Sequence, residues 1–321
     1  MEIKNRKKKV GILMGGPSSE REISFKSGKA VFEALRAADL EAIAIDIVTE
    51  DHRQNIELLK RHDPDVIFIA LHGKFGEDGG IQEILEEMGL PYTGSGVKAS
   101  ALAMDKIASR KIFQSRGIPV PRYLEISRCD WKPGYRVPAN FKFPLVVKPS
   151  SNGSSIGLSV IPDASGLDQA LRLAFSFDGR VLIEEYLQGR EMTVGILDDT
   201  ALPVVEIIPG HKFFDYEAKY QSGLTEYIVP ANIDALSCRI IQDAGLSAHR
   251  ALDCFAYSRA DIIFKDNTPY VLEVNTIPGF TVTSLLPKAA KVAGIEFKDL
   301  CLKLLDLAYE KTETKLARAG R

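Results

Sequence analysis

The stretch RADIIFKDNTPYVLEVNTIPGFTVTSL, residues 259–285, contains two apolar runs separated by the segment KDNTP. Turn-forming residues between two runs rich in β-branched and aromatic side chains predict an antiparallel strand pair. Side chains at positions i and i+2 share one face of a strand, so Glu273 and Asn275 are expected to point together. Leu272 and Val274 should then occupy the opposite face. The second strand is therefore expected to carry a polar pair on one face and apolar side chains on the other.

Three oxygen-bearing side chains of this stretch predict a metal site. Asp261, on the first strand, can join Glu273 and Asn275 on the second. Carboxylate and amide oxygens suit a hard cation, and beside phosphates that cation is usually Mg²⁺. A single strand glutamate is more often simply solvated, so a wet polar face is the alternative. The loop around Gly279 favours a binding site, because a glycine-containing loop at a strand end brings backbone N–H groups close to an anion.

Length and composition limit the classes of protein to consider. A chain of 321 residues exceeds a comfortable single core and predicts two or three domains. Its 45% hydrophobic and 26% charged residues are typical of a soluble globular protein, and a formal net charge of −2 gives no global attraction to nucleic acid or to an anionic membrane. No apolar run is long enough to span a bilayer, and the charged first residues do not suit a signal peptide. Four scattered cysteines without a Cys-x-x-Cys pair favour reduced thiols, so we expect a cytoplasmic protein.

The first third of the chain alternates strand and helix patterns. Apolar runs at residues 10–14, 41–48 and 66–71 predict strands, and the patterns at 23–37 and 55–61 predict helices. This alternation is typical of a doubly wound parallel sheet, in which ligands bind past the carboxyl ends of the strands.

Glycine-rich segments follow two of these strands. The Gly15-Gly16 pair lacks the G-x-G-x-x-G spacing of a dinucleotide-binding fingerprint, which argues against an oxidoreductase. His72 lies at a predicted strand end among four glycines. A ligand contact and a structural turn role are equally open for this histidine.

Two lysines and a Gly/Ser loop predict a phosphate site. The strand predicted at 143–148 ends in Lys148, and the loop 150–157 follows before a strand resumes. Such a loop can lay N–H groups and hydroxyls over phosphates while the lysine adds a point charge, although a plain hairpin linker is the alternative. The loop is not a Walker A sequence. Lys106, in a helix predicted at 99–115, adds a second cation. The whole set suits ATP whose β- and γ-oxygens are bridged by Mg²⁺.

The remaining patterns complete the predicted elements. Two prolines and a glycine predict a surface loop at 129–140, and aromatic and charged residues predict a lid at 211–220. The acidic strand edge at 184–187 suits an adenine and a ribose, although strand-end glutamates are usually just solvated. Further helices are predicted at residues 167–177, 234–252, 284–292 and 297–318, and further strands at 181–187, 191–197 and 202–208.

Seven short segments, spread nearly end to end along the chain, carry a family resemblance. They are GGPSSEREISFKSG at 15–28, HGKFGEDGGIQ at 72–82, MDK at 104–106, VVKPSSNGSSIG at 146–157, DYEAKY at 215–220, RADIIF at 259–264 and EVNTIPGFTVTSL at 273–285. Each is weak alone, but together and in this order they resemble the D-alanine–D-alanine ligases of the ATP-grasp superfamily. The resemblance implies an α/β fold that becomes α+β in the C-terminal half. An N-terminal doubly wound parallel-sheet domain, expected at 1–98, would precede two α+β domains that clamp ATP, at 99–187 and 188–321.

The resemblance also implies a reaction in two steps. The carboxylate of one D-alanine attacks the γ-phosphate of ATP and forms a D-alanyl phosphate. The amine of a second D-alanine then attacks that carbonyl, and phosphate leaves through a tetrahedral intermediate. The product, D-alanyl-D-alanine, serves peptidoglycan precursor synthesis. The family further implies two Mg²⁺ ions, with Mn²⁺ as a substitute, and a homodimer without nucleic-acid or membrane partners.

Individual residues match positions with known roles in that family. Those matching its magnesium ligands are Asp261, Glu273 and Asn275. Those matching its contacts to the nucleotide are Lys106, Lys148, Glu184, Leu187, Glu191 and Lys219. The groups matching those that stabilise the oxyanion are Arg259 and the backbone N–H of Gly279. Those matching the site of the first amino acid are Glu20 and His72, and those matching the second are Ser284 and Leu285. A hydrogen-bonded trio that ties three segments together is matched by Glu20, Ser154 and Tyr220.

Tyr220 bears on the choice of the second substrate. Enzymes of this family that use D-lactate do not carry tyrosine at the matching position, so Tyr220 favours an amine as the attacking group. A related ligase that takes D-serine or D-lactate is one alternative. The other is a nucleotide-binding protein without turnover, which the presence of Arg259 argues against because a mere binder needs no group for an oxyanion.

Overall fold

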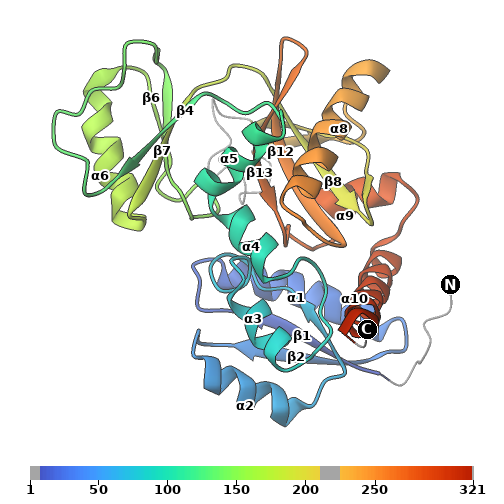
Figure 1. Ribbon diagram of the computed structural model, residues 1–321. Coiled ribbons are helices and arrows are strands. Elements are labelled where there is room, and N and C mark those ends of the chain that lie inside the picture. The colour runs from blue at the N-terminus through green and yellow to red at the C-terminus, as the bar shows by residue number, and fades with distance from the viewer. Residues whose placement is uncertain (1–7, 210–224, 320–321) are drawn as a thin grey trace.

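The first three strands of the chain form a parallel sheet. The structure is a computed structural model that describes residues 8–209 and 225–319 (Figure 1). β1 (Lys9–Gly15) lies between β2 (Glu41–Ile47) and β3 (Val66–Ile69), and both pairings are parallel. All three strands lie where the apolar runs predicted them. Their carboxyl ends face the rest of the chain, where the site described below is built.

Helices cover both faces of this sheet, which confirms the predicted doubly wound arrangement. On one face α1 (Arg21–Arg36) and α10 (Phe297–Ala319) pack over β1 and β3, and on the other α2 (His52–His62) and α3 (Gly80–Glu87) do so. The sequence did not predict α3, which begins at Gly80 with Gly79 as its N-cap. Figure 1 shows α10, the last helix of the chain, lying against the N-terminal sheet.

The middle of the chain forms an antiparallel sheet in the order β4-β7-β5-β6, with α6 packed on one face. Two strands of this sheet flank the Gly/Ser loop, and α6 spans the residues that its periodicity predicted. The sequence did not predict β4, an intermediate-burial strand at the sheet edge. The elements are β4 (Tyr123–Ser127), β5 (Leu145–Pro149), β6 (Ser159–Ile161), η1 (Ala164–Gly166), α6 (Leu167–Phe177) and β7 (Arg180–Glu185).

The C-terminal part contains a second antiparallel sheet. Its strands run in the order β11-β10-β8-β12-β13, with β9 beside β8, and α8 packs on its apolar face. The β12–β13 pair is the predicted hairpin. The elements are β8 (Arg190–Leu197), β9 (Thr200–Ala201), β10 (Val205–Pro209), β11 (Thr225–Ile228), α8 (Ala235–Ala251), β12 (Tyr257–Lys265), β13 (Thr268–Asn275) and α9 (Leu285–Val292).

A β-bulge in β13 corrects one predicted orientation. The register shifts after Asp261, whose partner is Glu273, and Leu272 is left without a partner. Val271 and Val274 both lie in the core against α8, and Leu272 lines the same cavity as Glu273. The prediction that Leu272 faces away from Glu273 was therefore wrong, because an inserted residue breaks the strict alternation of a strand.

The helix predicted over residues 99–115 is two helices. α4 (Val97–Met104) ends at Asp105, whose extended backbone (φ −81°, ψ 98°) interrupts the helix, and α5 (Lys106–Ser115) begins directly after it. The Asp105 carboxylate accepts hydrogen bonds from two amides of the first turn of α5 and acts as its N-cap. The apolar periodicity continues across the break and therefore gave no sign of it.

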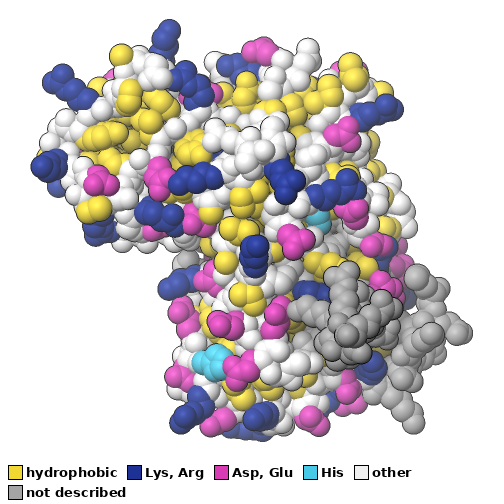
Figure 2. All heavy atoms as spheres, in the orientation of Figure 1, with side chains coloured by type: hydrophobic (Ala, Val, Ile, Leu, Met, Phe, Trp, Pro, Cys, Tyr) yellow, Lys and Arg dark blue, Asp and Glu magenta, His cyan; other side chains and the backbone are white. Residues whose placement is uncertain are grey.

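The sequence also predicted a surface loop, a lid and two domain boundaries. Residues 129–140 form no helix or strand, as predicted. The predicted lid, with Lys219 and Tyr220, lies outside the described residues, and the boundaries after residues 98 and 187 stay predictions. Among the described residues, no helix is long and apolar enough to cross a membrane. Figure 2 shows basic and acidic side chains interspersed over the visible face, consistent with the small net charge.

Candidate active site

Two adjoining cavities lie where the three sheets meet. A cavity of about 300 Å³ is lined mainly by the start of α1, by residues 72–77 after β3, and by the end of β13 with the loop that follows it. A smaller one, of about 120 Å³, lies between the central and C-terminal sheets. Four residues line both of them: Lys106, Gly153, Ser154 and Glu273. A molecule in one cavity can therefore reach a molecule in the other past these side chains.

The larger cavity gathers the residues predicted to face the amino-acid substrates. They are Glu20, His72, Arg259, Gly279, Ser284 and Leu285, and Ser154 of the predicted trio lines the same cavity. The smaller cavity gathers residues predicted for nucleotide and metal, namely Lys106, Lys148, Glu191, Asp261 and Glu273. Glu184 and Leu187 are not among the described residues that line either cavity.

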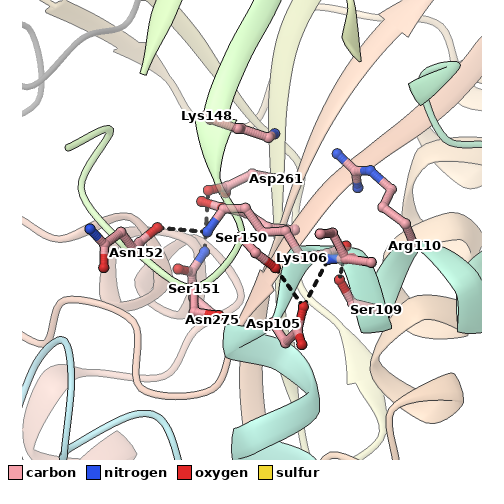
Figure 3. A network of polar contacts seen from close by, with 12 residues as sticks. Asp105, Lys106, Ser109, Arg110, Lys148, Ser150, Ser151, Asn152, Asp261 and Asn275 are labelled. Atoms are coloured by element: carbon pink, nitrogen blue, oxygen red, sulfur yellow. Dashed lines mark hydrogen bonds and ion pairs between the residues drawn. The ribbon is translucent and has the colours of Figure 1, made fainter. Parts of the chain in front are cut away.

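Lys106 holds the start of the Gly/Ser loop with both its backbone and its side chain. Its amide donates to the carbonyl of Ser150 at 2.9 Å, and its Nζ donates to the carbonyl of Asn152 at 2.7 Å. The same Nζ lies 3.3 Å from Oε2 of Glu273. Ser150 in turn donates its hydroxyl to Asp105 at 2.7 Å, a contact drawn in Figure 3. The lysine, the loop and Glu273, a predicted metal ligand, are thus held together by direct contacts.

Lys148 belongs to a buried group of three charges. Its Nζ lies 2.6 Å from Oε2 of Glu184, and Arg110 contacts Oε1 of the same carboxylate at 2.6 Å. Burial raises the pKa of Glu184, but the charges of Arg110 and Lys148 outweigh it and hold that pKa below its ordinary value. Burial lowers the pKa of Lys148, which Glu184 offsets only in part. Sequence reasoning missed Arg110, whose partners lie far away along the chain.

The predicted metal ligands lie together on the β12–β13 hairpin. Asp261 pairs with Glu273 in the register, and the amide Nδ2 of Asn275 donates to Asp261 at 3.2 Å, which leaves its amide oxygen for another partner. Within the described residues, no group of three or more His, Cys, Asp or Glu that could hold a metal occurs. Two carboxylates and an amide oxygen fit Mg²⁺ when phosphate oxygens complete the shell, as hard cations beside nucleotides require.

Arg259 is fixed in place by Asp261. Its Nε and Nη2 donate to the two carboxylate oxygens at 2.8 Å each, in the bidentate geometry that orients a guanidinium. Burial lowers the pKa of Arg259, but the charge and hydrogen bonds of Asp261 raise it above its ordinary value. Arg259 therefore stays charged in the larger cavity, where a positive group can stabilise a developing negative charge.

Glu20 connects the N-terminal domain to the Gly/Ser loop. Its Oε1 accepts a hydrogen bond from the hydroxyl of Ser154. Gly73 permits this arrangement, because a Cβ at its position would lie 2.5 Å from Oε2 of Glu20 and its φ of +74° disfavours other residues. Of the predicted trio, Glu20 and Ser154 are thus in contact, and Tyr220 lies outside the described residues.

His72 is buried and joins two segments. Its Nδ1 lies 3.2 Å from the carbonyl of Ile277, so that nitrogen carries the proton, and Nε2 accepts from the hydroxyl of Ser27 at 2.8 Å. Glu77 Oε1 lies 3.7 Å from Nδ1. Ser27 and Glu77 also line the larger cavity and were missed. Their position in the motifs that carry the family resemblance was the available signal.

The two residues predicted for the second substrate both line the larger cavity. Ser284 precedes α9 and accepts a hydrogen bond from the amide of Thr281 at 3.0 Å, and Leu285 is the first residue of that helix. A Cβ on Gly279 would lie 3.3 Å from Oγ of Ser284, so the glycine keeps the loop close. The loop therefore presents backbone groups and a hydroxyl at the end of β13.

Two solved structures that are similar to this chain are ligases by their titles. The structure titled D-alanine–D-alanine ligase from Bacillus anthracis complexed with ATP matches with a TM-score of 0.85 and 34% identity, over 96% of this chain and 99% of that one. VanG D-Ala:D-Ser ligase from Enterococcus faecalis matches with a TM-score of 0.79 and 32% identity, over 94% and 99%. These likenesses, with two antiparallel sheets enclosing lysines and carboxylates after a parallel-sheet domain, define an ATP-grasp ligase.

Sequence relatives identify the family within this class. Residues 48–95 match the D-ala D-ala ligase N-terminus, and residues 112–306 match the D-ala D-ala ligase C-terminus. A D-alanine–D-alanine ligase of Geotalea uraniireducens is 47% identical over 305 residues, 95% of this chain and 96% of that protein. One of Geobacter sulfurreducens is 46% identical over 299 residues, 92% and 93% respectively. The chain belongs to the D-alanine–D-alanine ligase family.

Proposed function

We propose that this protein joins two D-alanine molecules to D-alanyl-D-alanine at the expense of ATP, with D-alanyl phosphate as the intermediate and ADP and phosphate as the other products. The observation that carries the proposal is the pair of adjoining cavities that share Lys106, Ser154 and Glu273. One has the charges for a nucleotide and the other the mixed polar lining for amino acids. The dipeptide would serve peptidoglycan precursor synthesis.

The first step makes a leaving group. A carboxylate oxygen of one D-alanine forms a bond to the γ-phosphorus of ATP, the bond from that phosphorus to the bridging oxygen breaks, and ADP leaves with the electron pair. Lys106 and Lys148 neutralise phosphate charge, and the Gly/Ser loop that follows Lys148 supplies backbone N–H groups. Glu20, at the wall of the larger cavity, holds the ammonium of this D-alanine.

The second step forms the peptide bond. The neutral amine of the second D-alanine attacks the acyl carbonyl, the C–O bond to phosphate breaks, and phosphate leaves carrying the proton that the amine gives up. Arg259 and the N–H of Gly279 stabilise the oxyanion of the tetrahedral intermediate. Ser284 and Leu285 hold the second D-alanine, and Tyr220 favours an amine as the attacking group.

Asp261, Glu273 and Asn275 are proposed to hold Mg²⁺, as two ions, with Mn²⁺ as a substitute. When bound, the metal neutralises and orients the phosphate oxygens. Two of these side chains also contact other residues of the site. Asp261 orients Arg259 through hydrogen bonds, and Glu273 forms an ion pair with Lys106.

The test is an assay of purified protein with ATP, Mg²⁺ and D-alanine, in which ADP and phosphate are measured and the product is identified by thin-layer chromatography. We expect D-alanyl-D-alanine and D-alanine-dependent release of phosphate. D-Serine and D-lactate, supplied beside D-alanine, distinguish the related ligases, of which the VanG enzyme named above is one. Nucleotide binding without D-alanine-dependent ADP formation would favour the non-catalytic alternative. We also propose a cytoplasmic homodimer, as the family resemblance implies, and sedimentation of the purified protein tests the dimer.

A further inference from the structure

Arg110 has a place in the site that none of the roles above assigns. It lies on α5, one turn after Lys106, and its side chain is completely buried. Nε and Nη2 donate to Oε1 of Glu184 at 2.8 and 2.6 Å, and Nη1 donates to the carbonyl of Val271 at 2.8 Å. Burying an arginine costs desolvation free energy, which a carboxylate partner and hydrogen bonds at all three nitrogens offset. Figure 3 shows Arg110 and Lys148 extending toward one another from different elements.

Its contact with Val271 fixes one sheet relative to the other. β13 is the last strand of its sheet, so one row of its backbone groups has no neighbouring strand. At Val271 these groups are satisfied from outside the sheet, because the amide donates to the carbonyl of Pro119 at 2.9 Å and the carbonyl accepts from Arg110. Glu184 belongs to β7 of the central sheet. Arg110 therefore bridges the two sheets, directly before the bulge that turns Glu273 into the site.

Its contact with Glu184 sets the charge available to a nucleotide. Lys148 and Arg110 each contact one oxygen of Glu184, so the three side chains together carry a net charge of +1. Without Arg110 the remaining pair, Lys148 and Glu184, is neutral. In a buried site an uncompensated charge acts strongly on its neighbours. Glu184, which already contacts Lys148 at 2.6 Å, would then keep its full negative charge beside that lysine, and phosphate oxygens would have to compete with it.

We propose that Arg110 is a positioning residue for nucleotide binding, which neutralises Glu184 so that the charge of Lys148 is available to phosphate oxygens. The identity of the nucleotide as ATP rests on the proposed function. The test is equilibrium binding of ATP and of ADP, with Mg²⁺ and without D-alanine, by isothermal titration calorimetry. This measurement needs no turnover. Wild-type protein that binds nucleotide but makes no dipeptide would overturn the proposed function and leave the role of Arg110 testable.

Three variants separate charge from shape. R110M should weaken nucleotide binding about 10- to 100-fold, whereas R110K, which keeps the positive charge, should stay within about fivefold of the wild type. R110M/E184Q removes the competing carboxylate and restores a net charge of +1, so it should bind at least about fivefold more tightly than R110M. Lys111→Met is the matched control, because Lys111 is the next residue of α5 and pairs with Glu125 at the surface.

The outcomes decide between charge and packing. R110M that binds like the wild type, R110K that binds as weakly as R110M, or a double variant no better than R110M would each overturn the proposal. If R110M does not fold, R110K and R110M/E184Q carry the test. Both keep a net charge of +1, so R110K should then bind nucleotide within about fivefold of the wild type and the double variant within about 20-fold, and a larger loss in either would contradict the charge argument. Where turnover is found, the KM of R110M for ATP should rise above that of the wild type, and its KM for D-alanine should stay within about twofold.

Discussion

The carboxylate of Asp261 accepts hydrogen bonds from three side chains at once. Arg259 contacts both oxygens, Thr193 donates its hydroxyl to Oδ1 at 2.8 Å, and Asn275 donates to Oδ2. The residue proposed to bind the metal thus also orients the guanidinium that is proposed to stabilise the oxyanion. Because both tasks need the negative charge, neither survives its removal.

Asp261→Asn should therefore lower kcat/KM roughly 100-fold or more and raise the Mg²⁺ concentration needed for half-maximal rate. Thermal unfolding checks that the fold persists. Asp266→Asn is the matched control, since Asp266 lies in the turn of the same hairpin with φ +48°, a backbone conformation that asparagine tolerates. An Asp261→Asn protein with unchanged Mg²⁺ dependence would contradict the metal assignment.

His249 predicts how stability depends on pH. It is buried on α8, its Nδ1 lies 2.7 Å from Oγ of Ser258, and burial lowers the pKa of its imidazole from 6.5 to about 4, with Arg250 adding to this and Asp199 opposing it. Between these values the unfolded chain binds a proton that the folded chain does not. The free energy of unfolding should therefore fall by about 3 kcal/mol as the pH drops from above 6.5 to 4.

Urea unfolding at a series of pH values measures this dependence. His249→Asn cannot titrate, so it should lose this contribution to the slope while losing stability at neutral pH. His52, which is exposed and pairs with Glu87 at the surface, provides the control position. A slope that stays the same in His249→Asn and disappears in His52→Asn would show that another histidine is responsible.

Residues of the site differed in how far they could be predicted. Asp261, Glu273 and Asn275 were accessible because one hairpin carries them and strand geometry relates their positions. Arg110 was not, since its partners lie 74 and 161 residues away and a helix pattern treats it as one more polar position. Leu272 was placed on the wrong face because a bulge leaves no mark on an alternating pattern.

At the scale of elements, the break between α4 and α5 positions the Gly/Ser loop. Asp105 caps α5, accepts the hydroxyl of Ser150 and pairs with Arg180, which begins β7. The same turn places Lys106 against the loop. A continuous helix over residues 99–115, as the periodicity predicted, would have left the lysine without this anchor.

Asp105→Ala should cost about 1 kcal/mol of stability through the lost cap and should also weaken ATP binding several-fold, because the loop loses an attachment. The control is Asp234→Ala, which removes an equivalent cap: Asp234 accepts from two amides at the start of α8, away from the site. Chemical denaturation and ATP titration measure the two effects. Equal losses of ATP affinity in both variants would mean that the cap acts only through stability.

Strong periodicity explains which elements were predicted. α6 has a clear helical pattern of apolar residues, and the β12–β13 hairpin has two apolar runs with turn residues between its strands. The bounds of these elements could therefore be predicted from the sequence. β4 is partly exposed and short, and α3 starts directly after glycines, so neither produced a pattern that stands out from a loop. The contacts that these elements make within the fold, rather than local propensity, select their structure.

At the scale of the molecule, one core joins the two ends of the chain. A single cluster includes buried residues of β1, α1, β8, α9 and α10. Lys311 of α10 adds a contact, with its Nζ 3.1 Å from the carbonyl of Gly94 and 4.3 Å from the centre of the Tyr92 ring. The central sheet and α6 instead have a separate core, drawn from residues 124–183 alone. The N-terminal and C-terminal sheets should therefore unfold together, and the central sheet on its own.

The single tryptophan makes this division measurable. Trp131 packs on Phe175 of α6, with ring centroids 5.5 Å apart, so its fluorescence reports the central core, whereas far-UV circular dichroism reports all helices and strands. Leu304→Ala, in α10, should remove about 2–4 kcal/mol and shift the main dichroism transition while leaving the fluorescence transition in place. Leu171→Ala, in α6, should do the opposite. If Leu304→Ala moved both transitions equally, the chain would unfold as one cooperative unit. The separate cores would then not allow the sheets that enclose the site to move independently of one another.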